Sequence, residues 1–287
     1  MDAGADRGAV LPPKGDAELP IDSGPGPGPA DATADATADA TADAGSPVEP
    51  TTLFEAADAG VIRAVAIEGG KLYWYNQTEL RIVRADLDGG APTGVVENIK
   101  TKQFIVVGND AWYALDTDDD LHRQTIGAGD MTFATNGGAH GCVSVNREHT
   151  RIYVADHEGS RVLTVAVAGS LPEVVLGDAG VSRPWGVAVN DTTIFTTRLE
   201  AAVVAREIDG GVTTALATDQ KNPQCITLDE NGLMYWPEYA SGDIHRASID
   251  GGAHVVIAKG QTEPTQIALD DAFVYWNSGT KVMRLPR

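Results

Sequence analysis

The side chains with the most obvious potential for chemistry include a run of acids, Asp116-Thr117-Asp118-Asp119-Asp120. Carboxylates are the ligands that calcium prefers, and this run resembles the start of a calcium-binding loop. The glycine that such a loop needs at its sharp turn does not follow, and neither does the closing glutamate. We therefore expect an exposed acidic loop here. No metal ligand and no cofactor is predicted, with calcium as the alternative.

The histidines and cysteines offer a second chemistry. The six histidines show no zinc-ligand spacing. His140 stands two residues before Cys142, so a cysteine–histidine dyad for nucleophilic catalysis is one interpretation of the pair. The other is that Cys142 and Cys225 are small packed side chains. Since no nucleophile elbow, phosphate-binding loop or dinucleotide-binding motif is present, no catalytic residue is predicted.

Charge and composition disfavour several classes of partner. The chain has 287 residues and a formal net charge of −20. An anionic surface repels phosphate groups, so we expect no nucleic-acid partner. No uncharged apolar run reaches the roughly 18 residues of a membrane-spanning helix, so we expect no transmembrane segment.

Residues 1–50 differ in composition from the rest of the chain. The stretch GPGPGPADATADATADATADAGSP combines Pro-Gly alternation with an Ala-Asp-Ala-Thr repeat. Such a segment cannot bury enough apolar area to offset its ordering entropy, so we predict a disordered linker. It resembles the linkers that follow the lipid-attachment cysteine of bacterial exported lipoproteins. The resemblance implies a periplasmic, cell-surface or extracellular protein, although the sequence shows no signal peptide.

An internal repeat organises residues 51–287. Its clearest copies are LYWYNQTELRIVRADLDGGA and LMYWPEYASGDIHRASIDGGA. The aligned aromatic recurs in steps of 40, 40, 42, 40 and 40 residues, at Tyr73, Tyr113, Tyr153, Phe195, Tyr235 and Tyr275. A period of about 40 residues with short alternating apolar runs is typical of a β-propeller. We predict an all-β, six-bladed β-propeller with four strands in each blade.

The turns and the chain ends refine this prediction. Asp250-Gly251, with equivalents at Asp88-Gly89 and Asp209-Gly210, predicts type I′ hairpin turns after the third strand of a blade. The last repeat ends at Arg287 without its fourth strand, and an unpaired edge would be a liability. Thr51–Glu55 precedes the first repeat and is predicted to supply the missing outer strand, which closes the ring.

The phrases Tyr235-Trp236 and Ile244-His245-Arg246-Ala247-Ser248-Ile249-Asp250-Gly251 resemble the YWTD repeat of low-density-lipoprotein-receptor-type six-bladed propellers. The resemblance covers roughly residues 51–287. The fourth position of the signature is acidic at Asp116, Asp156 and Glu238, and departs from it at Asn76, Arg198 and Ser278. The third strand carries an arginine at Arg84, Arg123, Arg206, Arg246 and Arg284. The resemblance implies that these acids and arginines pair between neighbouring blades and are structural.

The segments that precede the innermost strands meet at one mouth of the central channel. Cys142 and Cys225 hold equivalent positions there, in blades three and five. A disulfide requires Cα atoms within about 7 Å, and we expect the intervening blade to prevent one. Trp185 is a plausible recognition anchor. We expect a ligand to contact Arg63, Gln103, His140, Arg183, Trp185, Asn222, Gln224, Glu263 and Gln266.

Two functions fit these observations. Propellers of the resembled family mostly bind proteins or serve as structural modules, which implies a non-catalytic, monomeric module that presents its channel mouth to a protein or a glycan. The alternative is a metal-dependent propeller hydrolase or lactonase, similar to gluconolactonases. Such an enzyme needs several carboxylates that converge on the channel, and the repeats offer few. The sequence therefore favours binding.

Overall fold

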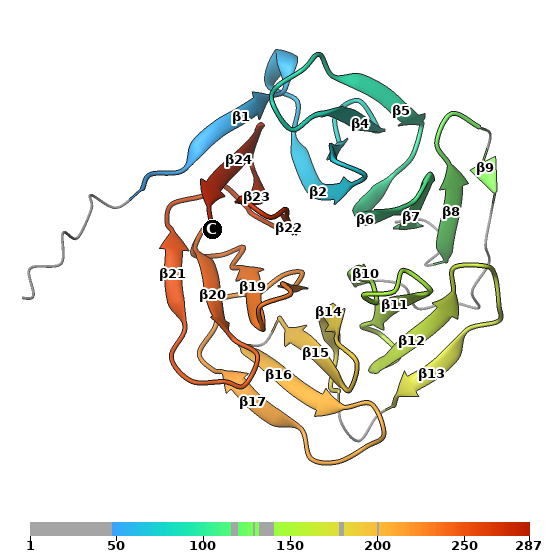
Figure 1. Ribbon diagram of the computed structural model, residues 1–287, viewed down its shortest axis with the longest axis vertical. Helices are drawn as coiled ribbons and strands as arrows, with labels where there is room; N and C mark the ends of the chain where they lie inside the picture. Colours follow the sequence, from blue (N-terminus) through green and yellow to red (C-terminus); the bar gives the residue numbers. More distant parts are fainter. Residues whose placement is uncertain (1–47, 116–119, 129, 132–140, 178–180, 200) are drawn as a thin grey trace, which may run out of the picture. The chain divides into compact units, whose positions relative to one another are not determined.

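The structure is a computed structural model that describes residues 48–115, 120–128, 130–131, 141–177, 181–199 and 201–287. Six four-stranded antiparallel sheets lie as blades around a central channel (Figure 1). This confirms the predicted six-bladed β-propeller. The described residues include one short helix, the 3-10 turn η1 (Ala57–Ala59), and none of their helices is long and apolar enough to cross a membrane.

The strands of each blade follow one another from the channel outward. The innermost strands are β2 (Ile62–Glu68), β6 (Thr101–Val107), β10 (Val143–Val145), β14 (Pro184–Val189), β18 (Thr227–Leu228) and β22 (Ile267–Leu269). The second strands are β3 (Lys71–Asn76), β7 (Asp110–Leu115), β11 (Arg151–Asp156), β15 (Thr193–Arg198), β19 (Leu233–Pro237) and β23 (Phe273–Ser278). The third strands are β4 (Arg81–Asp86), β8 (Leu121–Thr125), β12 (Arg161–Ala166), β16 (Ala202–Glu207), β20 (Ile244–Ser248) and β24 (Lys281–Pro286). The outer strands are β5 (Thr93–Glu97), β9 (Asp130–Met131), β13 (Glu173–Leu176), β17 (Thr214–Ala217), β21 (Val255–Ala258) and β1 (Thr51–Glu55).

The repeated aromatic explains how the blades pack. It lies on the second strand of every blade and is buried in all six. The described residues form six hydrophobic clusters, one for each seam between neighbouring blades. In the seam between blades five and six, for example, Tyr235 packs with Ile267 and Trp276. The 40-residue period is therefore the spacing of the side chains that hold the blades together.

The ring closes as predicted. β1 pairs antiparallel with β24, and Thr51 lies opposite Arg284 while Glu55 lies opposite Lys281. Blade six thus takes its outer strand from the start of the described chain and its other three strands from the end (Figure 1). Phe54 of this strand stacks on Trp74 of blade one, with ring centroids 4.8 Å apart. This contact links the closing strand to the neighbouring blade as well.

The predicted type I′ turns are wrong in detail. Gly251 and Gly252 have positive φ angles of 86° and 104°, but Asp250 is not among the described residues with positive φ. The amide of Gly251 donates to the carbonyl of Ser248 instead, so the turn is centred one residue earlier. β20 and β21 are joined by a longer connection than a two-residue hairpin, and longer loops are commonly built around a type I turn.

Candidate functional site

A cavity of 690 Å³ occupies one part of the central channel. Its wall is formed by the later residues of the innermost strands β2, β6, β10, β14, β18 and β22 and by the turns that follow some of them. The cavity therefore opens away from the segments that precede these strands, where the sequence predicts the ligand site. Its volume lies within the range of about 300–1,000 Å³ that is typical of small-ligand pockets.

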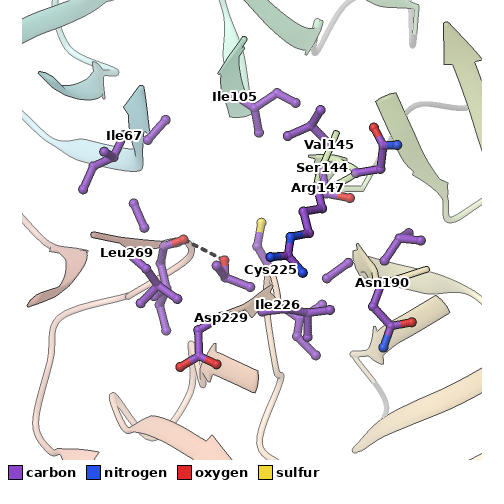
Figure 2. A pocket seen from close by; sticks show the side chains of 18 of the residues that line it. Ile67, Ile105, Ser144, Val145, Arg147, Asn190, Cys225, Ile226, Asp229 and Leu269 are labelled. Carbon is purple, nitrogen blue, oxygen red and sulfur yellow. Dashed lines mark hydrogen bonds between the residues drawn. The ribbon is translucent and has the colours of Figure 1, made fainter. Parts of the chain in front are cut away.

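The wall of the cavity is largely aliphatic. Ile67, Ile105, Val145, Ile226 and Leu269 line it from five different blades (Figure 2). Phenylalanine, tyrosine and tryptophan are absent from its lining among the described residues. An apolar group that enters the cavity would lose contact with water, at a gain of roughly 25 cal/mol for each Å² that it buries.

Arg147 brings a positive charge to this wall. It lies in the turn after β10, where the amide of His149 donates to the carbonyl of Asn146 at 2.9 Å. Its side chain extends toward the middle of the cavity (Figure 2). Within the described part of the chain, its guanidinium has no hydrogen-bond or ion-pair partner. A guanidinium offers five donors in a planar fork that matches a carboxylate or a phosphate.

Two buried polar atoms in the wall also lack partners. The Oγ of Ser144 and the Oε1 of Gln266 are buried and make no hydrogen bond to any other described residue. Both residues line the cavity. Buried polar atoms are normally paired with protein or with ordered water, so these two oxygens are unsatisfied positions within the wall.

Two carboxylates of the cavity are already engaged. Glu68 accepts a hydrogen bond from the amide of Gly108 at 2.9 Å. Asp229 accepts one from Arg287 at 2.5 Å and another from the hydroxyl of Tyr235 at 3.2 Å. Burial and the negative charge of Asp229 raise the pKa of Tyr235, so this phenol stays neutral at physiological pH. Both acids therefore contribute to the fold through these contacts.

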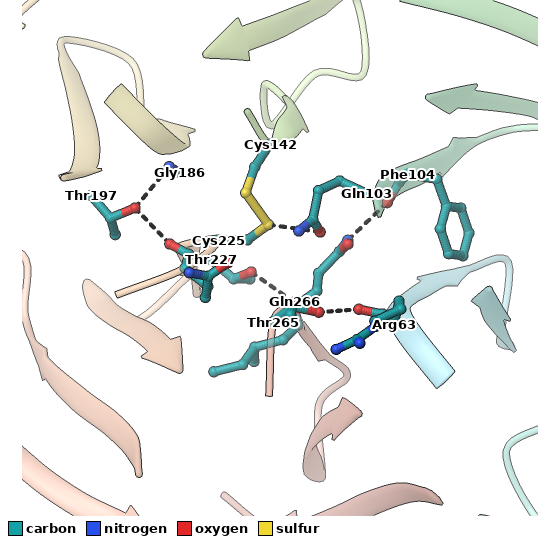
Figure 3. Close-up of a disulfide and its surroundings, with 12 residues drawn as sticks. Arg63, Gln103, Phe104, Cys142, Gly186, Thr197, Cys225, Thr227, Thr265 and Gln266 are labelled. Carbon is teal, nitrogen blue, oxygen red and sulfur yellow. Dashed lines mark hydrogen bonds between the residues drawn. A yellow bond between two sulfur atoms is a disulfide. The ribbon is translucent and has the colours of Figure 1, made fainter. Parts of the chain in front are cut away.

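A disulfide crosses the other part of the channel. The prediction that the intervening blade prevents this bond was wrong. Cys142 and Cys225 are bonded, with Cα atoms 5.6 Å apart (Figure 3). The innermost strands converge on the channel axis, so the ends of two such strands lie close together even when one blade stands between them. The Oε1 of Gln103 lies 3.0 Å from the sulfur of Cys225, and the Nε2 of Gln266 donates to the carbonyl of Phe104 at 2.8 Å. These buried side chains from four blades meet at the axis.

The disulfide excludes the cysteine–histidine dyad, which was one interpretation of the sequence. Cys142 holds its sulfur in a disulfide and offers no thiol for nucleophilic attack. His140 lies outside the described residues. The same is true of Asp116 and of most of the acidic run that begins with it, so the predicted loop there stays a prediction.

The structure gives the predicted mouth residues partners within the protein. Arg63 donates to Glu263 at 2.6 Å and to Gln77 at 2.8 Å. Hydrogen bonds from Arg63 and Tyr239 lower the pKa of Glu263. The mouth is thus crossed by an ion pair between blades one and six. Ligand contact by these residues stays a prediction.

A second group of mouth residues surrounds His157, which sequence reasoning missed. The ring of His157 packs edge-on against Trp185, with centroids 5.6 Å apart, and accepts a hydrogen bond from Arg183 at 3.2 Å. Nearby along the rim, Gln224 donates to the side chain of Asn222 at 2.8 Å. Of the eight predicted mouth residues that the structure describes, Gln266 is the one that also lines the cavity.

The two described acids of the repeat, Asp156 and Glu238, bind partners other than the repeat arginines. Asp156 binds Arg161 of its own blade at 2.6 Å, and Glu238 accepts hydrogen bonds from the amide of Lys221 and the hydroxyl of Ser241. Arg123 binds Asp110, also within its own blade. The five arginines are partly buried on third strands, at Arg84, Arg123, Arg206, Arg246 and Arg284.

Two of the repeat arginines link neighbouring blades through backbone carbonyls. Arg123 donates to the carbonyl of Val167 in blade three, and Arg284 to that of Leu87 in blade one, both at 3.4 Å. The third signature position contributes as well. The hydroxyl of Thr197 donates to the carbonyl of Gln224 in blade five at 2.6 Å (Figure 3). A structural role for these arginines agrees with the contacts of Arg123 and Arg284.

One described group of side chains could hold a metal ion, and it lies outside the cavity. Ligand atoms of Glu238, Asp243 and His245 all lie within 4.8 Å of one another. Burial lowers the pKa of His245, although the charge of Glu238 opposes this, so the imidazole is neutral at physiological pH. The cavity lining contains no group of three such residues among those that the structure describes.

Known structures share this architecture. The chain is similar to a gluconolactonase from Xanthomonas campestris, with a TM-score of 0.69 and 13% identity, over 83% of this chain and 89% of that one. It is also similar to virginiamycin B lyase from Staphylococcus aureus, with a TM-score of 0.63 and 10% identity, over 84% of this chain and 99% of that one. These likenesses show the fold. No known family model matches the sequence, and no curated protein matches it significantly.

At these identities the comparisons show the shared propeller fold alone. The repeat's resemblance to YWTD propellers beyond the six-bladed fold stays a prediction. The sequence-based prediction of the site missed Arg147, because that prediction covered only the segments before the innermost strands. The sequence did contain a signal for this residue. The residues that follow the innermost strands occupy the same repeat position, and Arg147 stands there as a basic residue where other blades have Asn190, Asp191 and Glu230.

Proposed function

We propose that this propeller is a non-catalytic binding module and that its ligand occupies the channel cavity. The observation that carries the proposal is Arg147, whose guanidinium extends over an aliphatic cavity and has no partner among the described residues. A charged group without a protein partner beside an apolar wall is a typical determinant of ligand orientation.

The ligand that fits best has an aliphatic body and one carboxylate. The carboxylate pairs with Arg147, and the aliphatic body packs on Ile67, Ile105 and Val145. A protein partner that inserts its C-terminal residues carries both groups. A glycan fits less well, because the aliphatic wall would leave its hydroxyl groups without hydrogen bonds, and burying them unpaired is costly.

The acids at the cavity limit the charge of the ligand. Asp191 and Glu230 line it together with Arg147, and the whole chain has a net charge of −20. A polyphosphate or a nucleic acid would be repelled by this field. A single carboxylate beside Arg147 keeps the favourable pair and adds little repulsion.

A metal-dependent hydrolase or lactonase is the second candidate, favoured by the shared fold of the gluconolactonase. A hydrolase of that kind needs a cation in the channel. The described group of potential ligands, Glu238, Asp243 and His245, lines a different pocket. Arg147 near the cavity centre would also repel a cation. Binding is therefore the function that the geometry supports better.

The test uses N-acetylated tetrapeptides that end in Leu, Ile or Val, titrated into the full-length protein by calorimetry. We expect binding that depends on the free carboxylate. The C-terminal amides of the same peptides and the Arg147→Met variant should bind roughly tenfold to a hundredfold more weakly, since a charge-assisted hydrogen bond contributes about 1.5–3 kcal/mol. The matched control is Arg81→Met, an arginine of β4 that is not among the residues lining the cavity, and this variant should bind as the wild type does.

Two results would contradict the proposal. Equal affinity of acids and amides would remove the role of Arg147. Hydrolysis of gluconolactone that depends on added calcium, and that Arg147→Met leaves intact, would favour the enzymatic alternative.

We also infer that the protein works in an oxidising compartment. A disulfide that joins two blades at the channel axis persists outside the reducing cytosol. This agrees with the export that the composition of residues 1–50 suggests.

A further inference from the structure

A second pocket, of 500 Å³, lies on the outer part of blades four and five, away from the channel cavity. Its wall includes the segment after β17, the loop between β19 and β20, and the connection between β20 and β21. The polar side chains that line it include Glu238, Asp243, His245 and His254.

Three of these side chains converge. Ligand atoms of Glu238, Asp243 and His245 lie within 4.8 Å of one another. The side chains of Glu238 and His245 are each only 5% exposed, and the Oε2 of Glu238 lies 3.6 Å from the Nε2 of His245. Two carboxylates held this close, one of them buried, repel each other, and a bound cation would relieve that repulsion.

His245 is the independent sign of a ligand. Both of its ring nitrogens are buried and neither makes a hydrogen bond to a described residue. The imidazole stacks on the indole of Trp236, with centroids 5.2 Å apart and planes 7° apart. Trp236 in turn donates its N–H to Gln220 at 2.7 Å. The ring is therefore held in one plane, with its Nε2 3.6 Å from the carboxylate of Glu238 and no hydrogen bond from either ring nitrogen to a described residue.

The carboxylate of Glu238 is oriented by its own contacts. Its Oε1 accepts a hydrogen bond from the amide of Lys221 at 2.8 Å, and its Oε2 accepts one from the hydroxyl of Ser241 at 2.6 Å. The same hydroxyl accepts the amide of Asp243 at 3.2 Å. Hydrogen bonds of this kind orient the ligands of metal sites.

A fourth ligand is available at the pocket. The exposed ring of His254 lies 5.0 Å from the ring of His245, measured between centroids. Two imidazoles and two carboxylates form a set that suits zinc and similar divalent transition metals, whereas calcium and magnesium prefer oxygen ligands alone. The open pocket gives an ion a path from solvent.

We propose that Glu238, Asp243 and His245 form a binding site for a divalent transition metal of the zinc type, completed by His254 or a water. The site would fix the loop between β19 and β20 to the connection that leads to β21. It is separate from the channel cavity and does not depend on the ligand that the cavity binds.

The test starts from full-length protein stripped of metal with a chelator and dialysed. Zinc chloride is titrated by calorimetry, and cobalt chloride is added in parallel while the visible absorption of tetrahedral Co²⁺ is recorded. We expect one ion per chain. His245→Gln, and separately Asp243→Asn at the half-buried edge, should weaken binding at least roughly tenfold and abolish the cobalt signal. Calcium or magnesium in excess should not compete.

The matched control is His122→Gln, because His122 holds the same repeat position in blade two and also stacks on an aromatic ring, that of Tyr113. It should bind zinc as the wild type does. The proposal fails if no stoichiometric zinc binding is found. It also fails if binding survives both site variants, or if His122→Gln reduces binding as much as they do. His254→Gln, an exposed substitution that should not perturb folding, provides a second variant should His245→Gln unfold.

Discussion

Cys142 and Cys225 are joined by a disulfide across the channel axis, with Cα atoms 5.6 Å apart and 83 residues of sequence separation. The bond joins the innermost strands of blades three and five and bypasses blade four. A cross-link of this kind limits the separation of three blades at the place where they are nearest one another. It also forms part of the boundary of the cavity, since Cys225 is one of the lining residues.

Replacing both cysteines with alanine should lower the free energy of unfolding by about 2–4 kcal/mol, because a closed loop of this length restricts the unfolded chain. Urea unfolding followed by tryptophan fluorescence measures the change. Wild-type protein in reductant should unfold at the same urea concentration as the double variant. An unchanged midpoint in both would show that the disulfide does not contribute to stability.

Phe54→Ala should destabilise the closure of the ring. Phe54 is half-buried and stacks on Trp74, so we expect a loss of about 1–3 kcal/mol in the free energy of unfolding. The comparison is Val255→Ala on another outer strand, where the side chain is 47% exposed and the expected change is within about 0.5 kcal/mol. Equal effects of the two substitutions would argue against closure through β1.

Gly186→Ala should be destabilising because there is no space for a side chain. A Cβ atom at this position would lie 2.5 Å from the hydroxyl of Thr197 and 2.6 Å from the carbonyl of Gln224. We expect a loss of about 1–3 kcal/mol, measured by thermal and urea unfolding. Gly177→Ala is the control, since its Cβ would meet only Val174, at 3.9 Å. Equal stability of the two variants would contradict the close approach of blades four and five at Gly186.

The ion pair between Arg63 and Glu263 should make stability depend on pH. Hydrogen bonds from Arg63 and Tyr239 hold the pKa of Glu263 below its ordinary value of 4.5. A carboxyl group whose pKa is lowered in the folded state stabilises the fold above its unfolded pKa and loses that contribution as the pH falls through the folded pKa.

We therefore expect Arg63→Met to reduce stability at about pH 6 by about 0.5 kcal/mol or less, because Glu263 is 46% exposed and solvent screens the pair. The difference from wild type should shrink toward about pH 3. Urea midpoints at both pH values provide the measurement. A difference that grows as the pH falls would contradict the assigned sign.

The number of blades and the closure of the ring follow from local patterns in the sequence. The aromatic that recurs from Tyr73 to Tyr275 sets the number of blades, because one large side chain per repeat fills each seam. The strand at Thr51–Glu55 followed from the missing edge of the last repeat. Both are properties of local pattern and of the need to pair every strand, which a linear sequence contains.

The site was decided by the tertiary structure alone. Cys142 and Cys225 can bond because the innermost strands come close together at the channel axis. The repeat in the sequence does not encode that distance. The same convergence fills one part of the channel with Gln103 and leaves the cavity beside Arg147 in the other. Glu238 and His245 meet because Glu238 directly follows β19, and β19 pairs with β20, which carries His245. Side chains that converge from distant repeats depend on the radius and twist of the assembled ring, and these are set by the packing of all six blades together.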